Sequence, residues 1–202
     1  MTDSAPLVLA GDASPRQALS KRQAATVSDL LDAGLALLRE EGYDALTLRG
    51  VATRANVTHT TAYTYFTSKA HLVAEILWRQ LTSLPHPKPN PRARLGTRVT
   101  EALRGPDALF AGDAALAEAA LTALLQSDPD VRRLRNAIGA DLMGRLQLAL
   151  EPDANPAVLD GLVLALSGAM LQAGMGYFSF DGVVERIASL AALLERVPGP
   201  KR

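Results

Sequence analysis

The feature that most constrains this chain is the stretch 47–72, TLRGVATRANVTHTTAYTYFTSKAHL. Apolar residues recur there at helical spacing, which predicts two short helices, the second with Ala62 and Phe66 on its buried side. Asn56 and Val57 stand between the two helices, where a tight turn is needed. This order of a short helix, a turn and a second short helix indicates a helix-turn-helix.

The outward side of the second helix is polar. His59, Thr60, Tyr63 and Thr64 fall on it and offer hydroxyl groups, an imidazole and a phenol. Such groups can hydrogen-bond to base edges and phosphates. The helix therefore suits a DNA groove better than it suits an ordinary protein surface.

The composition limits the other classes of protein. With 202 residues, 48% of them hydrophobic and 21% charged, the chain can bury one sizeable core or two small ones. It has no cysteine, which excludes thiolate metal sites and nucleophiles, and its three histidines lack the spacing of metal ligands. We therefore expect no catalytic site, cofactor or metal. The formal net charge of zero predicts only modest nonspecific affinity for DNA.

The rest of the sequence is helical in pattern and predicts an all-α fold. Residues 1–20 show no sustained periodicity and are expected to be a flexible leader without the features of a secretory signal, which favours the cytoplasm. Asp128 and Asn155 each precede a proline and are expected to cap the helices that follow. Besides the two short helices, the expected helices span residues 21–42, 68–84, 92–103, 106–126, 129–150, 156–180 and 182–197.

An uncharged run of twenty residues, 161–180, has the length of a membrane span. Its glycines, its polar residues and the aspartate at each end weigh against a membrane, and we expect none. Small residues recur along it three or four positions apart, which would let another helix approach closely. This run and the apolar last helix therefore predict an interface with a second copy of the chain, with an intrachain core as the alternative.

Residues 22–80 resemble the TetR family of bacterial repressors. The family usually has Gly where Asn56 stands, and Asn is able to adopt the left-handed conformation that such a turn requires. It often carries a basic residue and a small one where His59 and Thr60 stand, so we expect an individual base preference and transfer no operator sequence. The motifs that carry the resemblance are Glu41-Gly42-Tyr43, Thr47, Val57-Thr58, Tyr63-Thr64-Tyr65-Phe66 and Ser68-Lys69.

The resemblance implies a ligand-responsive regulator, most readily a repressor. A homodimer would bind a palindromic operator on double-stranded DNA and leave it when a small lipophilic effector binds. The implied domains are a helix-turn-helix domain at 21–67 and an effector-binding and dimerisation domain at 68–202. Capping alone would also account for Thr47 and Thr58. The residues that the resemblance places at DNA are Thr47, Thr58, His59, Thr60, Thr61, Tyr63, Tyr65 and Lys69.

The resemblance also implies an effector cavity among the helices that follow the DNA-binding domain, and a dimer interface of four helices. Simple core packing is the alternative for each cavity residue, and a helical small-molecule-binding or scaffold protein without DNA binding is the alternative function. The cavity candidates are Trp78, Leu103, Phe110, Leu121, Leu125, Gln126, Ile138, Leu142, Met143, Leu146 and Gln172. The interface candidates are Gly161, Ala165, Gly168, Gln172, Gly176, Val184, Ile187, Ala191 and Leu194.

Overall fold

The computed structural model describes residues 21–152 and 154–195. The expected leader at 1–20 lies outside the described residues. Within them the chain forms nine α-helices and one 3₁₀ helix and no strand, which confirms the all-α fold. The helices are α1 (Lys21–Ala45), α2 (Leu48–Arg54), α3 (His59–Tyr65), α4 (Lys69–Ser83), α5 (Leu95–Gly112), α6 (Ala114–Leu124), α7 (Pro129–Leu150), α8 (Pro156–Gly174), η1 (Phe180–Gly182) and α9 (Val183–Leu194).

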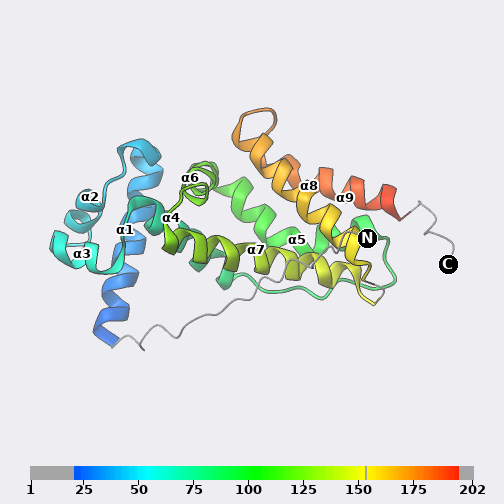
Figure 1. Ribbon diagram of the computed structural model, residues 1–202, viewed down its shortest axis with the longest axis horizontal. Coiled ribbons are helices and arrows are strands. Elements are labelled where there is room, and N and C mark those ends of the chain that lie inside the picture. The colour runs from blue at the N-terminus through cyan, green and yellow to red at the C-terminus, as the bar shows by residue number, and fades with distance from the viewer. Residues whose placement is uncertain (1–20, 153, 196–202) are drawn as a thin grey trace, which may run out of the picture.

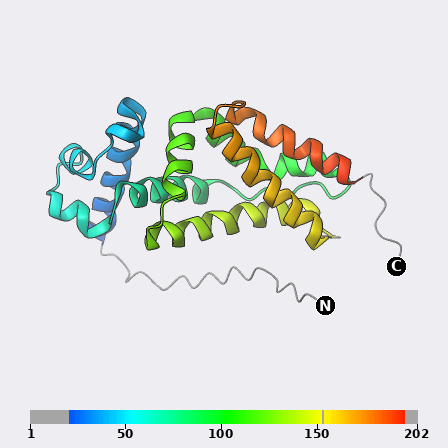
Figure 2. The same ribbon diagram turned by 45° about the horizontal axis from the view of Figure 1, so that its top comes forward.

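The helices form an elongated molecule. Helices α1, α2 and α3 make up one end, and α8 and α9 pack side by side toward the other (Figure 1). Helix α4 runs between them and contacts α1 on the one hand and α6 and α7 on the other, as the turned view also shows (Figure 2). Helix α1 also contacts α6, so the orientation of the N-terminal helices is set through both α4 and α6.

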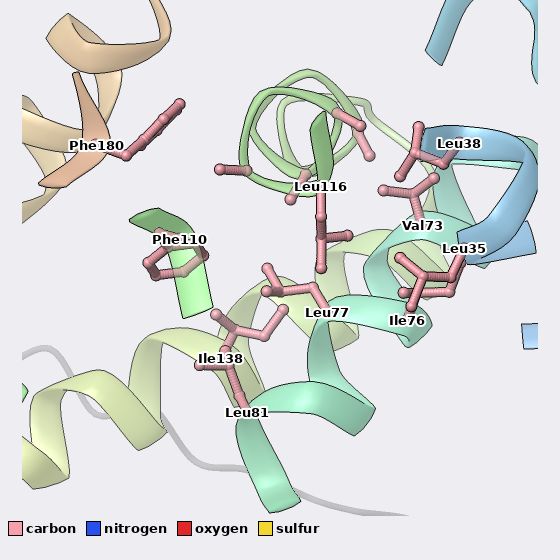
Figure 3. Close-up of a cluster of buried hydrophobic side chains, with 14 of the residues drawn as sticks. Leu35, Leu38, Val73, Ile76, Leu77, Leu81, Phe110, Leu116, Ile138 and Phe180 are labelled. Carbon is pink, nitrogen blue, oxygen red and sulfur yellow. The ribbon is translucent and has the colours of Figure 1, made fainter. Parts of the chain in front are cut away.

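One hydrophobic core joins the two ends of the molecule. Leu35 and Leu38 of α1 lie beside Val73 and Ile76 of α4, and the cluster continues toward α6 and α7 (Figure 3). Helices α1 and α4 approach closely at Gly34, where an added Cβ would lie 3.0 Å from a methyl carbon of Leu72. Because apolar area removed from water stabilises the fold in proportion to its size, this shared core couples the two ends energetically.

The predicted helix boundary at Pro106 is wrong. Pro106 is buried inside α5, where packing against the rest of the core outweighs the helical hydrogen bond that proline cannot donate. The break falls instead at Asp113, whose carboxylate accepts the Leu116 N–H at 3.1 Å and so caps α6. The same carboxylate lies 2.7 Å from Arg39 Nη2 of α1, so one residue ends α5, begins α6 and holds α1.

The end predicted for the apolar helix at 156–180 is also too late. Helix α8 ends at Gly174, and Gly176 adopts a φ of +81°, which the absence of a side chain permits. Phe180 then lies in the separate 3₁₀ helix η1. By length and composition α8 could cross a membrane, with a mean hydropathy of 1.5, but helices of soluble proteins pass the same test, and this is weak evidence.

The predicted caps of α7 and α8 are confirmed. The Asp128 carboxylate accepts the Asp130 N–H at 2.8 Å, and the Asn155 side chain accepts the Ala157 N–H at 2.9 Å. A proline follows each cap, at the first position of the helix, where its missing N–H costs nothing. The start of α7 is thereby fixed, which matters because Asp128 also makes longer-range contacts.

Candidate functional site

The helix-turn-helix consists of α2, a turn at Ala55–Val57, and α3. Thr47 Oγ1 accepts the Gly50 N–H and Thr58 Oγ1 accepts the Thr61 N–H, both at 3.1 Å, so both predicted caps are confirmed. Asn56 has a φ of 54°, the left-handed conformation expected of it. Local interactions of this stretch therefore suffice to start both helices and to reverse the chain between them.

Helix α3 has one buried side and one exposed side, as its sequence predicts. Ala62 is buried and so is Phe66 at its end, and both belong to the core. On the other side Tyr63 is 59% exposed, and Thr60 and Thr64 are exposed as well. Thr64 Oγ1 donates to the Thr60 carbonyl at 2.8 Å. The helix thus presents a phenol and hydroxyl groups away from the protein.

Three further candidates lie at the border of this surface. His59 and Thr61 are half-buried, and Thr61 Oγ1 lies 2.8 Å from Thr58 Oγ1. Tyr65 packs partly against the core. These three side chains therefore lie beside the exposed side of α3 and are less exposed than Tyr63.

An open groove runs beside α3, between the helix-turn-helix and the start of α1. Its volume is about 620 Å³. Its lining mixes apolar surface with polar side chains and includes one cation, Arg22, which suits the sugar-phosphate backbone of a nucleic acid. The lining residues are Arg22, Gln23, Thr26, Asn56, Val57, Thr58, Thr61 and Tyr65.

The basic residues near this surface differ in their surroundings. Lys69 Nζ donates to the carbonyls of Tyr43 at 2.9 Å and of Asp44 at 3.2 Å, so it stabilises the end of α1. An ammonium group has three donors, and a phosphate contact by Lys69 stays a prediction. Arg54 is paired with Glu40, and its hydrogen bonds hold the pKa of the Glu40 carboxyl below its usual value.

Arg49 was not among the residues predicted to contact DNA. It is exposed in the first turn of α2, and within the described residues it forms no ion pair. Its guanidinium therefore keeps its donors available for a phosphate. Whether an arginine forms an ion pair depends on which acidic residues the fold brings near it, so the sequence pattern alone did not reveal Arg49 as a candidate.

A second feature is an apolar cavity of about 370 Å³, bounded mainly by α6, α7 and α8. Leu125 and Leu171 line it and are exposed, so it opens to solvent between the end of α6 and α8. Its volume lies within the range of small-molecule sites, about 300–1,000 Å³. The predicted residues that line it are Phe110, Leu121, Leu125, Ile138, Leu142, Met143 and Leu146.

Four predicted cavity residues do not line it. Leu103 is buried in the core and Trp78 packs partly against it. Gln126 is exposed and its Nε2 donates to the Thr122 carbonyl at 3.4 Å, while Gln172 is exposed on α8. Periodicity could not separate these positions from lining residues, because it marks an apolar face without showing whether that face meets a neighbour or a void.

The start of α7 is tied to the residues that follow the recognition helix α3. Ser68 Oγ donates to Asp128 Oδ2 at 2.8 Å, and Thr67 Oγ1 donates to the same oxygen at 3.1 Å. Burial acts to raise the pKa of Asp128, but these hydrogen bonds and those from backbone N–H groups outweigh it and hold the pKa below its usual value. We call this contact of Thr67, Ser68 and Asp128 the α4–α7 joint.

The chain is similar in sequence to known regulatory proteins. A sequence profile for bacterial regulatory proteins of the tetR family matches residues 30–76. The HTH-type transcriptional regulator Rv0767c of Mycobacterium tuberculosis is 39% identical over 183 residues, which cover 87% of this chain and 83% of that protein. This chain belongs to the TetR family.

Other relatives agree with this membership. The HTH-type transcriptional repressor KstR of Rhodococcus jostii is 33% identical over 135 residues, 63% of this chain and 60% of the repressor. The crystal structure of a TetR transcriptional regulator from Rhodococcus sp. RHA1 has the same fold, with a TM-score of 0.70, 20% sequence identity, and coverage of 88% of this chain and 98% of that one. The chain is thus a TetR-family helix-turn-helix transcriptional regulator related to KstR repressors.

This TetR-family chain exposes an apolar surface on α8. Leu164 is 73% exposed, and Leu171 and Met175 are exposed on the same side of the helix. A Cβ added at Gly161 or Gly168 would meet nothing within 4 Å, so these positions leave the surface open to a close neighbour. We call this surface, Gly161, Leu164, Gly168, Leu171 and Met175, the α8 face.

Four of the predicted interface residues need correction. Val184, Ile187 and Ala191 of α9 are at most 6% exposed and pack within the core of their own chain, so they cannot offer a partner appreciable surface. Gly176 lies beyond the end of α8 and marks its stop. These three residues of α9 thus pack within their own chain, whereas Leu193 of α9 and the α8 face are exposed.

Proposed function

We propose that this TetR-family regulator is a cytoplasmic repressor that binds a palindromic operator as a homodimer and releases it when a small apolar effector binds. The observation that carries the proposal is the exposed polar side of α3, with Tyr63 59% exposed above the buried Ala62. The stability of a surface helix does not require an exposed phenol and exposed hydroxyl groups that a capped turn holds in place. A major groove offers such groups donors and acceptors on every base pair.

Two copies of α3 are needed for specific binding. The helix has only seven residues, which reach few bases, and the groove beside it supplies contacts without sequence information. The α8 face provides apolar surface through which two chains could associate. Twofold symmetry of the dimer then requires an operator with twofold symmetry.

The cavity and the α4–α7 joint support release by a ligand. The end of α6 and the start of α7 contribute to the cavity, and Asp128 at the same end of α7 binds Thr67 and Ser68 directly after α3. A ligand that fits one arrangement of α6 and α7 better than another would therefore shift the recognition helix. Its effect on DNA affinity equals its preference for one arrangement over the other.

Selection from random duplex DNA tests the proposal. The purified full-length protein should enrich a palindrome, and Tyr63→Ala should weaken affinity for the selected duplex at least ten-fold by removing a contact to the groove. Tyr177→Ala is the matched control, because Tyr177 is 77% exposed and lies after α8, away from α3. A wild-type protein that enriches no sequence would instead support the scaffold alternative and refute the proposal.

Release is tested on the selected duplex. Compounds that raise the melting temperature of the protein identify ligands, because a ligand that binds only the folded state stabilises it. Such a ligand should lower the affinity for the duplex. Ligands that stabilise the protein and leave DNA affinity unchanged would contradict an effector role for the cavity.

A further inference from the structure

The cavity holds one charged side chain in an otherwise apolar lining. Among the described residues that line it, Arg135 of α7 alone carries a charge, and Ser167 is the other polar side chain. The Ser167 hydroxyl donates to the Val163 carbonyl at 2.9 Å, so its hydrogen is already engaged. Any strong polar interaction with a bound molecule must therefore come from Arg135.

The Arg135 guanidinium is only partly satisfied. Arg135 Nη1 donates to the Leu124 carbonyl at 2.7 Å, at the end of α6, and within the described residues Arg135 forms no ion pair. A guanidinium has five N–H donors in a fork that matches a carboxylate in bidentate geometry. Covering it with a neutral apolar molecule would remove it from water without a counter-charge, which is unfavourable.

We propose that the effector is a small amphipathic monocarboxylate whose carboxylate pairs with Arg135 and whose apolar body fills the cavity. This inference rests on the proposed effector role of the cavity. One guanidinium balances one negative charge, so a singly charged carboxylate matches it better than a phosphate dianion, which would need a second cation. The volume of about 370 Å³ favours one alkyl chain or a compact ring system.

The cavity gives the apolar body a direction. Lining residues of α7 extend from Arg135 to Leu146, a span of about 16 Å along the helix. Val163, Leu166 and Met170 of α8 line the opposing wall. The carboxylate would thus sit at the α6–α7 end, the end that carries Asp128 of the α4–α7 joint, and the apolar body would extend away from it.

Calorimetric titration of the full-length protein with decanoate and with decan-1-ol tests the charge directly. The two probes share an alkyl chain and differ in the head group. The wild type should bind decanoate at least ten-fold more tightly than decan-1-ol. Arg135→Gln should abolish this preference and leave the affinity for decan-1-ol within about two-fold of wild type, which also shows that the cavity is intact.

Two further variants separate the role of Arg135 from general effects. Arg132→Gln removes an exposed charge one turn earlier on α7, outside the cavity lining, and should keep the wild-type preference. Arg135→Lys keeps a charge without the planar fork and should keep part of the preference, which provides a test if Arg135→Gln does not fold. Equal binding of both probes by the wild type, binding of neither, or a preference that survives in Arg135→Gln would overturn the inference.

Failure of this inference is distinguishable from failure of the proposed function. A protein that enriches a palindrome but does not prefer decanoate remains a regulator with another class of effector. A protein that prefers decanoate through Arg135 but enriches no DNA is a carboxylate-binding protein without the proposed operator. Decanoate that binds through Arg135 and releases the selected duplex supports both proposals.

Discussion

At the residue scale, Asn56 shows how one backbone angle fixes the path of the chain. Asn and Gly adopt its φ of 54° at little cost in free energy, whereas for a β-branched residue this conformation costs about 1–2 kcal/mol. Thr58 begins α3 two residues later, so an error in this turn would misdirect the whole recognition helix. The residue that the family usually has here, Gly, satisfies the same requirement.

We expect Asn56→Gly to change the free energy of unfolding by less than about 1 kcal/mol and Asn56→Val to lower it by about 1–2 kcal/mol. Urea denaturation measures both. Asn136→Val is the control, because Asn136 is exposed on α7 in ordinary helical conformation, where the change should cost only a few tenths of a kcal/mol. A loss in Asn56→Val no larger than in Asn136→Val would contradict backbone strain as the cause.

Two glycines of α7 form a matched pair for testing the cavity. A Cβ added at Gly139 or Gly144 would meet nothing within 4 Å, but only Gly139 lines the cavity. Alanine at either position should raise the free energy of unfolding by about 0.5–1 kcal/mol, since glycine weakens a helix interior. Only Gly139→Ala should also weaken decanoate binding, because its methyl group takes up cavity space. Calorimetry would contradict this if both variants bound decanoate like the wild type.

At the element scale, the α4–α7 joint links two helix starts by side chains. Ser68 caps α4 by accepting the His71 N–H at 3.0 Å, while its hydroxyl donates to Asp128, the cap of α7. Beneath it, buried His71 accepts the Thr67 N–H through Nδ1 at 3.2 Å. Side-chain contacts therefore connect the start of α7 to the first turn of α4 and to the residues that follow α3.

We expect Asp128→Ala and Asn155→Ala each to lower the free energy of unfolding by about 0.5–2 kcal/mol, because each removes a helix cap. Only Asp128→Ala should weaken affinity for the selected duplex, several-fold, because the Asn155 side chain caps α8 and, among the described residues, forms no hydrogen bond to the N-terminal helices. Fluorescence anisotropy measures the affinity. Equal DNA affinities of the two variants would mean that the joint does not hold the recognition helix.

Asp128 also predicts a pH dependence. Hydrogen bonds hold its pKa in the folded protein below the usual value, so the ionised carboxylate contributes stability that is complete above the unfolded pKa and is lost as the pH falls through the folded value. The melting temperature of the wild type should exceed that of Asp128→Asn most at neutral pH, and the difference should shrink in strong acid. Calorimetric scans that show a constant difference down to the lowest pH would contradict this.

At the scale of the whole molecule, the distribution of apolar surface sets the proposed assembly. Helix α9 buries Val184, Ile187 and Ala191 against its own chain, and α8 leaves the α8 face uncovered. Leu164→Arg should therefore yield a folded monomer with weakened DNA affinity, because a charge at the face opposes its burial against a second copy. Gln147→Arg places the same charge on an exposed position of α7 and should leave the dimer intact. Sedimentation velocity decides, and a Leu164→Arg dimer would refute the α8 face.

The local features of the protein follow from its sequence alone. The caps at Thr47, Thr58, Asp128 and Asn155 and the turn at Asn56 were all predictable, because each depends on residues within a few positions along the chain. The all-α fold and the two sides of α3 follow from helical spacing for the same reason. These features place a polar recognition helix on the surface.

Which apolar surfaces cover one another depends instead on how the helices pack in three dimensions. Ile187 has the spacing of an interface residue but is buried in its own chain. Pro106 lies inside a helix because it is packed in the core. Arg135 lines a cavity because the helices α6, α7 and α8 leave a space between them. Asp128 and Ser68 lie sixty residues apart. Such pairings cannot be read from periodicity, because the hydrophobic effect is non-directional and many arrangements of apolar helices satisfy the same pattern.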